Sequence, residues 1–276
     1  MPRTAGMEAS SRAEPGVSPG WFEIGDAMTY LDLFAGVGGM SLGLDRAGMR
    51  CVGQVEIDEY CQRVLAKHWP TVPRWNDVRT FTGDDCERPD LVAAGFPCTD
   101  VSNAGRRAGI DGEHSGLWFE CPRIIRILRP RFVLIENVAA ILGRGLDRVL
   151  CDLAGVGYDA EWQTLRAGEF GAHHRRARVF ILAHRADASR IGLSRSGPLT
   201  KGPWSREQFA GLIQAELRLA VPAGSIGGIS DGISSRTHRL RALGNAVVPK
   251  ISQWIGERIM AAAGDVNSKT LVREVQ

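Results

Sequence analysis

A proline–cysteine pair placed directly after an apolar run is the first candidate for chemistry in this chain. The run Asp90–Gly95 leads into Phe96, Pro97 and Cys98, and the residues that follow are polar. Polar neighbours favour an exposed thiol over a buried one. A cysteine attacks as its thiolate, which nearby N–H dipoles or cations stabilise. Cys98 is therefore the candidate nucleophile.

The chain has six cysteines and contains neither a CxxC pair nor a Cys/His cluster with zinc spacing. Most free cysteines are small buried hydrophobes, and we expect that role for Cys51, Cys121 and Cys151. We predict free thiols and no metal site.

An acid and two arginines follow or open other apolar runs. Glu136 comes after the predicted strand 132–135, where a carboxyl group could hold or donate a proton at a substrate ring nitrogen. Capping of the next helix is the alternative role. Arg176 and Arg178 share one face of a strand, and two cations there suit a phosphate or a developing anion. An exposed charge run would be the plainer explanation.

A glycine-rich loop follows the first strand. Gly36, Gly38 and Gly39 lie between a strand and a helix, where backbone N–H groups can approach a ligand. Glu56, about 20 residues on, could accept hydrogen bonds from both hydroxyls of a ribose. These residues predict a nucleoside cofactor and leave NAD and S-adenosylmethionine open, although Ser41 stands where a dinucleotide fingerprint has its third glycine. Asp77 could bind an adenine amino group or merely cap a turn.

Strands alternate with helices along the first half of the chain, which predicts a parallel sheet with helices on both faces. Ligands bind beyond the carboxyl ends of such strands, so the candidate residues should meet at one edge. Two later strands are expected to form a hairpin-like edge. The strands are predicted at 29–34, 51–56, 90–95, 132–135, 159–165 and 178–183.

The composition bounds the class of protein. The 276 residues carry a formal charge of +3 and no apolar run long enough to span a membrane. From Leu165 to Arg258 there are 15 basic and 6 acidic residues, so the C-terminal third is basic and the rest acidic. This asymmetry favours a polyanion-binding face on a catalytic body. With no N-terminal signal peptide, we expect a cytoplasmic protein.

The order of these elements also predicts a domain organisation. Residues 186–236 hold eight glycines and lack periodicity, so they form a small lobe that leans on the main body. The expected parts are a flexible leader 1–26, a catalytic and cofactor-binding domain 27–185, the lobe 186–236, a returning C-terminal helix 237–262 and a flexible tail 263–276.

Taken together, the motifs resemble those of the C5 cytosine-specific DNA methyltransferases, in sequence and in order. The resemblance covers about residues 29–185 and 237–260 and looks like the compact, bacteriophage-type members. It rests on Leu31–Gly39 (LDLFAGVGG), Glu56–Asp58 (EID), Gly95–Cys98 (GFPC), Glu136–Val138 (ENV), Arg176–Val179 (RARV) and Gly244–Pro249 (GNAVVP). Departures from the family pattern are His173 and His174 before the arginines, Thr99 after the cysteine and Asn76 before Asp77.

The resemblance implies a Rossmann-like, S-adenosylmethionine-dependent methyltransferase fold with a small target-recognition lobe. It implies methyl transfer to carbon 5 of a flipped-out cytosine in a specific duplex DNA sequence, through a covalent adduct with the Cys98 thiolate. The other implied catalytic residues are Glu136, Arg176 and Arg178. The implied cofactor-binding residues are Asp32, Phe34, Gly36, Gly38, Gly39, Glu56, Asp77, Phe96, Pro97, Asn245 and Val247.

The resemblance also implies double-stranded DNA as the partner, with a cognate restriction endonuclease as a further one, and we expect a monomer in a bacterial or phage-infected cytoplasm. Three alternatives stay open. The same scaffold could methylate RNA, or it could bind DNA with little or no turnover. The glycine loop alone would also fit an NAD-dependent oxidoreductase.

Overall fold

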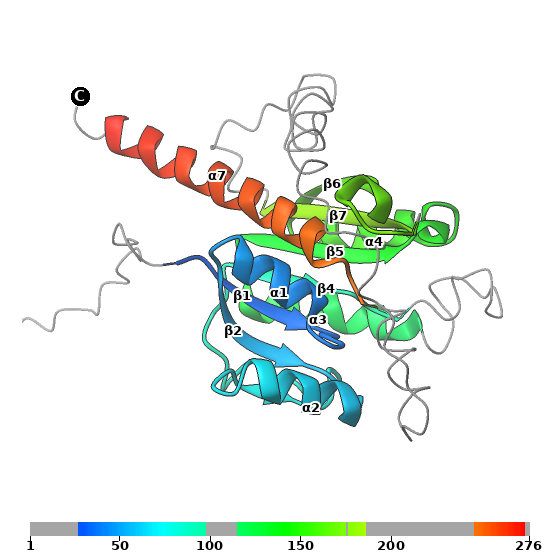
Figure 1. Ribbon diagram of the computed structural model, residues 1–276. Coiled ribbons are helices and arrows are strands. Elements are labelled where there is room, and N and C mark those ends of the chain that lie inside the picture. Colours follow the sequence, from blue (N-terminus) through cyan, green and yellow to red (C-terminus); the bar gives the residue numbers. More distant parts are fainter. Residues whose placement is uncertain (1–26, 98–114, 175, 186–245, 274–276) are drawn as a thin grey trace, which may run out of the picture.

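The computed structural model describes residues 27–97, 115–174, 176–185 and 246–273. Within these ranges seven strands form one sheet in the order β3-β2-β1-β4-β5-β7-β6 (Figure 1). The strands are β1 (Thr29–Leu33), β2 (Arg50–Val55), β3 (Arg74–Trp75), β4 (Leu91–Ala94), β5 (Phe132–Val138), β6 (Tyr158–Arg166) and β7 (Ala177–Arg185).

Helices follow most of the strands. The α-helices are α1 (Gly39–Arg46), α2 (Glu59–His68), α3 (Glu120–Leu128), α4 (Leu146–Gly155) and α7 (Pro249–Arg273). Short 3-10 turns are η1 (Ser115–Phe119), η2 (Ala139–Gly143) and η3 (Ala167–Phe170). None of these described helices is both long and apolar enough to cross a membrane.

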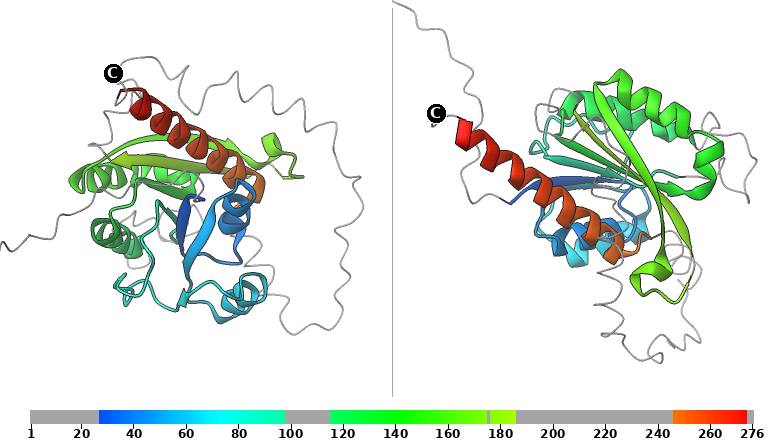
Figure 2. Two further views of the ribbon diagram at one scale, coloured as in Figure 1. Left: turned by 90° about the vertical axis from the view of Figure 1, so that its left-hand side faces the viewer. Right: turned by 90° about the horizontal axis from the view of Figure 1, so that it is seen from above.

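The sheet separates two apolar cores. Alternate residues of each strand point to opposite faces, so Leu91 and Ala93 of β4 enter one core while Val92 and Ala94 enter the other. Helices α1 and α7 lie side by side over the first face (Figures 1 and 2). Helices α3 and α4 bury their apolar stripes against the second face. The predicted α/β sheet, covered on both faces, is confirmed.

Strand β7 runs in the opposite direction to its two neighbours. It pairs antiparallel with β5 on one side and with β6 on the other, whereas β1, β2, β3, β4 and β5 are mutually parallel. The expected antiparallel pair of late strands is therefore present, with β6 outermost and β7 inside the sheet. Because of this reversal, the beginning of β7 lies at the edge where the parallel strands end.

Two expectations about the elements were wrong. Helix α7 continues to Arg273, although we expected the helix to end at 262 and a flexible tail to follow. Cys151 is exposed, unlike the buried Cys51 and Cys121. Helix α4 turns Val149 and Leu153 into the core, and Cys151, two residues after Val149, lies on the opposite side of the helix. The predicted leader 1–26 and lobe 186–236 lie outside the described residues.

Helices α1 and α7 pack closely because Gly43 has no side chain. A Cβ atom at Gly43 would overlap the Ser252 hydroxyl and the Pro249 carbonyl, and would lie 2.7 Å from the Gln253 nitrogen. Backbone atoms of a packed helix cannot move aside cheaply, so the two helices would have to separate.

We expect Gly43→Ala to lower the free energy of unfolding by about 1–3 kcal/mol through overpacking. Gly155→Ala is the matched control, since within the part of the chain that the structure describes no atom lies within 4 Å of its Cβ position at the end of α4. Urea denaturation of both variants measures the difference. Equal stability of the two variants would contradict close packing of α1 on α7.

Candidate active site

The candidate residues meet at one edge of the sheet, beyond the carboxyl ends of its parallel strands. The loop 34–38 follows β1, Glu56 follows β2, and Asp77 lies two residues after β3. Pro97 lies three residues after β4, and Glu136 lies two residues before the end of β5. Arg176 and Arg178 flank the start of the reversed strand β7. Topology therefore brings together side chains that are up to 144 residues apart, from position 34 to position 178, as the sequence predicts.

Glu136 is a buried acid with a cation beside it. Its residue surface is 7% exposed, and its Oε1 lies 2.8 Å from Nε of Arg178. The two residues are diagonal neighbours on adjacent strands, since Val138 stands opposite Arg178 and Phe180 opposite Glu136. Burial raises the pKa of Glu136 to about 7, even though Arg178 and Arg176 both act to lower it. The acid can therefore carry a proton near neutral pH.

The ion pair does not saturate the carboxyl group. Among the described residues, Oε1 of Glu136 has no partner that meets standard hydrogen-bond geometry, although Nε of Arg178 lies 2.8 Å away. A Cβ atom on Gly95 would lie 3.4 Å from the other oxygen, Oε2. Glycine at position 95 thus leaves room next to the acid. A buried acid with spare bonding capacity is typical of a site that binds a ligand.

Arg176 is held differently from Arg178. Its Nη2 donates a short hydrogen bond to the Ala246 carbonyl, just before α7. Burial and the like charge of Arg178 lower its pKa. Arg176 therefore joins the start of β7 to the entry of α7, while Arg178 is the arginine that contacts the acid.

The glycine loop is shaped by positive φ angles. Phe34 has φ 60°, Gly36 has φ 55° and Gly38 has φ 84°, and a φ above zero is uncommon in a residue other than glycine. A Cβ atom added to Gly38 would lie 2.5 Å from the Trp69 ring, and one added to Gly39 would overlap the Val247 carbonyl. Those two glycines therefore permit packing within the chain.

Gly36 is different, because no atom of the described residues lies within 4 Å of its Cβ position. Its N–H donates to Oε2 of Glu56 at 2.7 Å, and the Asp58 N–H donates to Oε1 at 2.7 Å. Burial raises the pKa of Glu56. Each carboxylate oxygen keeps a second lone pair. An open space beside an oriented carboxylate fits the ribose of a nucleoside cofactor.

Asp32 and Phe96, both implied cofactor contacts, have their side chains inside the protein. Asp32 is 1% exposed and accepts a 2.6 Å hydrogen bond from the Ser41 hydroxyl, which in turn accepts one from Gln54 at 3.2 Å. Burial raises the pKa of Asp32 to about 7. The Phe96 ring packs 5.1 Å from the Trp118 ring. In this structure Asp32 therefore anchors the first turn of α1, and Phe96 belongs to the core.

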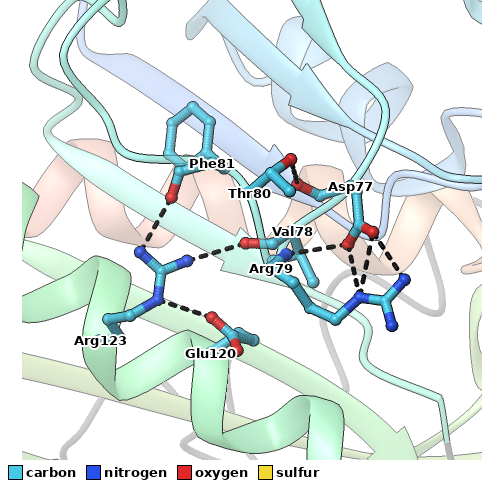
Figure 3. Close-up of polar contacts among 7 residues, drawn as sticks. All are labelled: Asp77, Val78, Arg79, Thr80, Phe81, Glu120 and Arg123. Atoms are coloured by element: carbon cyan, nitrogen blue, oxygen red, sulfur yellow. Dashed lines mark hydrogen bonds and ion pairs between the residues drawn. The ribbon is translucent and has the colours of Figure 1, made fainter.

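Asp77 lies half-buried on a short segment held from two sides (Figure 3). Both of its carboxylate oxygens accept hydrogen bonds from Arg79, with Nη2 of Arg79 2.6 Å from Oδ2. These bonds lower the pKa of Asp77. From α3, the Arg123 guanidinium donates to the carbonyls of Val78 and Phe81. Neither arginine was singled out in the sequence, although Arg79 stands only two residues from Asp77.

Of the remaining predicted site residues, some lie within the part of the chain that the structure describes and others do not. Pro97 is exposed, and Val247 is half-buried with its carbonyl facing Gly39. The candidate nucleophile Cys98 and the predicted cofactor residue Asn245 lie outside the described residues. Within the described residues, no group of three His, Cys, Asp or Glu side chains is arranged to hold a metal ion.

Comparison with known proteins identifies a family whose model matches the part of the chain that carries these acids, arginines and glycines. Residues 28–209 match the family model described as C-5 cytosine-specific DNA methylase. The chain belongs to this family. The match covers the whole of the described sheet.

Two curated relatives are type II methyltransferases. M.DsaV of Dactylococcopsis salina is 34% identical over 56% of this chain and 45% of its own length. M.CviJI of Paramecium bursaria Chlorella virus IL3A is 38% identical over 64% of this chain and 49% of its own length. This chain thus spans about half the length of these relatives.

One solved structure supports the fold. A prophage-encoded E. coli protein, provisionally assigned as a DNA modification methyltransferase, superposes with a TM-score of 0.62 at 17% identity. The match covers 86% of this chain and 100% of that one. At this identity the likeness concerns the fold alone.

The buried acid generates a prediction about pH. Glu136 has a pKa of about 7 in the folded chain against 4.5 for a free glutamate, so the folded state binds this proton more tightly. Its contribution is fully favourable below pH 4.5 and is lost as the pH rises through 7. Glutamine does not titrate, so the Glu136→Gln variant does not lose this stability as the pH rises. We expect the stability of this variant relative to the wild type to rise by about 2–3 kcal/mol between pH 5 and pH 8.

Urea denaturation of both proteins across this pH range measures the effect. Asp32, whose pKa is also raised to about 7, is common to both proteins and cancels in the difference. Parallel stability curves for the two proteins would contradict a raised pKa at Glu136.

Proposed function

We propose that this chain transfers a methyl group from S-adenosylmethionine to carbon 5 of cytosine in duplex DNA. The observation that carries the proposal is the buried Glu136 carboxyl group, which keeps an oxygen without a well-formed hydrogen bond next to Arg178. A ring nitrogen of cytosine can share a proton with such an acid. Family membership supports the same reaction class.

Glu136 would hold a proton at ring nitrogen 3 of the cytosine. Withdrawing electrons there makes carbon 6 more electrophilic, so that a thiolate can add to it. We assign that thiolate to Cys98, which follows Pro97 by one residue. The new bond between sulfur and carbon 6 moves an electron pair toward carbon 5, which becomes nucleophilic. Carbon 5 would then take the methyl group as the bond from that group to the cofactor sulfur breaks. Transfer of the carbon 5 proton to water would restore the ring and expel the thiolate.

The arginines would act on charge around the ring. Arg178 stays within 2.8 Å of Glu136, so it would limit the pKa of the acid and stabilise negative charge at the site. Arg176 ties the start of β7 to Ala246, three residues before α7, and would maintain the shape of the site from the other side.

The cofactor would bind along the ends of β1, β2 and β3. When bound, S-adenosylmethionine would supply an electrophilic methyl group on a positively charged sulfur. The open space at Gly36 and the oriented carboxylate of Glu56 suit its ribose, and Asp77 would accept from the adenine amino group. Phe34 and Val247 would border the same space.

DNA would be held by the basic C-terminal third of the chain. Its excess of arginine and lysine suits phosphate contacts, and the segment 186–236 would read base edges in the major groove. A stacked base is out of reach of a buried acid, so the target cytosine would leave the duplex. We further propose a monomer in the cytoplasm of a bacterial or phage-infected cell, and a restriction endonuclease of matching specificity.

Transfer of a tritiated methyl group from S-adenosylmethionine to duplex DNA tests the function. We expect Cys98→Ala and Cys98→Ser to reduce transfer to background, because the covalent step is lost. Glu136→Gln should lower kcat by about a hundred-fold or more. Cys151→Ser is the matched control, since Cys151 is exposed on α4, and it should keep full activity.

Full transfer by Cys98→Ala would exclude the mechanism. A parallel assay on tRNA separates the substrates, and preference for tRNA would make the chain an RNA methyltransferase. DNA binding without turnover at saturating cofactor would indicate a non-catalytic DNA-binding protein. Calorimetry with NAD and S-adenosylmethionine tests the cofactor assignment.

The Asp77–Arg79 pair predicts an effect on cofactor affinity. Because Arg79 occupies both carboxylate oxygens, an adenine amino group would have to displace it. We expect Arg79→Gln to tighten binding of S-adenosylhomocysteine by up to about five-fold, the range of an exposed ion pair. Calorimetry measures this. Arg63→Gln, which breaks the exposed pair with Glu59 on α2, should leave the affinity unchanged, and weaker binding by Arg79→Gln would refute the competition.

A further inference from the structure

We propose that Arg123 is a positioning residue that holds the segment Asp77–Phe81 so that Asp77 discriminates adenine from its deaminated counterpart. This inference rests on the proposed function, because it assumes that Asp77 faces the base of the cofactor. It adds a residue from α3, an element that contributes nothing else to the predicted cofactor site.

The Arg123 guanidinium makes three hydrogen bonds in three directions (Figure 3). Its Nη2 donates to the Val78 carbonyl at 2.8 Å and its Nη1 donates to the Phe81 carbonyl at 2.9 Å. Its Nε donates to Oε2 of Glu120 at 2.6 Å. The guanidinium is a rigid planar fork, so these bonds fix the distance between the two carbonyls as well as their direction.

The segment has little regular structure to hold it otherwise. Residues 76–82 form neither helix nor strand. The Thr80 and Phe81 N–H groups both donate hydrogen bonds to the Asp77 carbonyl and so close a single turn. The side chains of Val78 and Phe81 point into the core, where the Phe81 ring lies 4.9 Å from the Trp75 ring. Arg123 bonds to the polar atoms of the same two residues, so the turn is fixed through side chains and carbonyls together.

This arrangement leaves Asp77 on the outer side of the turn. Its carboxylate is directed toward Arg79 and away from the carbonyls that Arg123 binds (Figure 3). Asp77 is one residue before Val78, so a shift of that carbonyl would move the carboxylate with it. The position of the Asp77 carboxylate thus depends on a side chain from another element.

Partial burial makes the contact stronger than an exposed ion pair. The side chains of Arg123 and Glu120 are 35% and 24% exposed, and hydrogen bonds with an ionised donor are about twice as strong as neutral ones. A lysine at position 123 would keep the charge but could not span two carbonyls and a carboxylate in one plane. The pair Arg123→Lys and Arg123→Gln therefore separates geometry from charge.

The experiment measures binding of two nucleosides by calorimetry with the full chain. S-adenosylhomocysteine carries the adenine amino group, and S-inosylhomocysteine carries a carbonyl oxygen in its place. We expect the wild type to prefer the adenine compound. Arg123→Lys and Arg123→Gln should weaken S-adenosylhomocysteine binding by about 10–150-fold, the range expected for a hydrogen bond to a charged group, and should bring the ratio of the two affinities close to one.

Arg126→Gln is the matched control, because Arg126 is exposed one turn along the same helix, and it should retain both affinities. Glu120→Gln, which keeps an acceptor and removes the charge, should show an intermediate loss. Thermal unfolding of each variant reports whether the fold persists. If Arg123→Gln fails to fold, Arg123→Lys and Glu120→Gln still measure the ratio.

Two results would overturn the inference and leave the proposed function standing. One is an unchanged ratio in Arg123→Lys and Glu120→Gln, since the clamp would then have no part in base discrimination. The other is a wild type that binds both nucleosides equally well, since Asp77 would then not read the base. If the wild type binds neither compound, the proposed function itself fails, and the inference fails with it.

Discussion

The burial of the Glu136 carboxyl group is the constraint on which the rest of the site depends. An ionised acid in the protein interior costs several kcal/mol unless a cation or donors compensate it. Arg178 compensates only partly, because burial keeps the pKa of the acid raised to about 7 despite the guanidinium 2.8 Å away. The protein therefore maintains an acid that can exchange a proton near neutral pH, as a reaction on a nucleobase requires.

The reversal of β7 allows this pairing. In a fully parallel sheet the start of each strand lies at the opposite edge from the ends of its neighbours. Because β7 runs antiparallel to β5, its first residues lie beside the last residues of β5. Arg178 thus reaches Glu136 without any long loop. The same edge receives the glycine loop, Glu56 and Asp77 from the parallel strands, so the proposed catalytic and cofactor groups share one rigid support.

Much of this organisation can be predicted from the sequence, because apolar runs and the glycine loop carry strong local signals. The strands at 29–34, 51–56 and 90–95 match the observed bounds within one residue at each end. The antiparallel pair of late strands is also predicted, whereas the ion pair of Arg178 with Glu136 is not. Helices α2 and α4 were not predicted. The two-residue strand β3 is too short to leave a pattern.

Side-chain direction was harder to foresee. A motif places Asp32 and Phe96 at the ends of strands, but packing decides where they point, and both turn into the interior. The arginines at 79 and 123 escaped notice for a related reason. Their role depends on carbonyls and a carboxylate that only the folded chain brings near them. The places of Cys98 and Asn245 stay predictions.

Helix α7 has a consequence for the order of folding. It covers the face of the sheet formed by Tyr30, Leu91 and Leu134 together with α1, yet it follows these strands by more than a hundred residues. During synthesis this apolar face stays open to water until α7 has left the ribosome. Chaperones would meet the nascent chain there, because an uncovered sheet face favours aggregation. The body of this protein can close only after α7 has been synthesised.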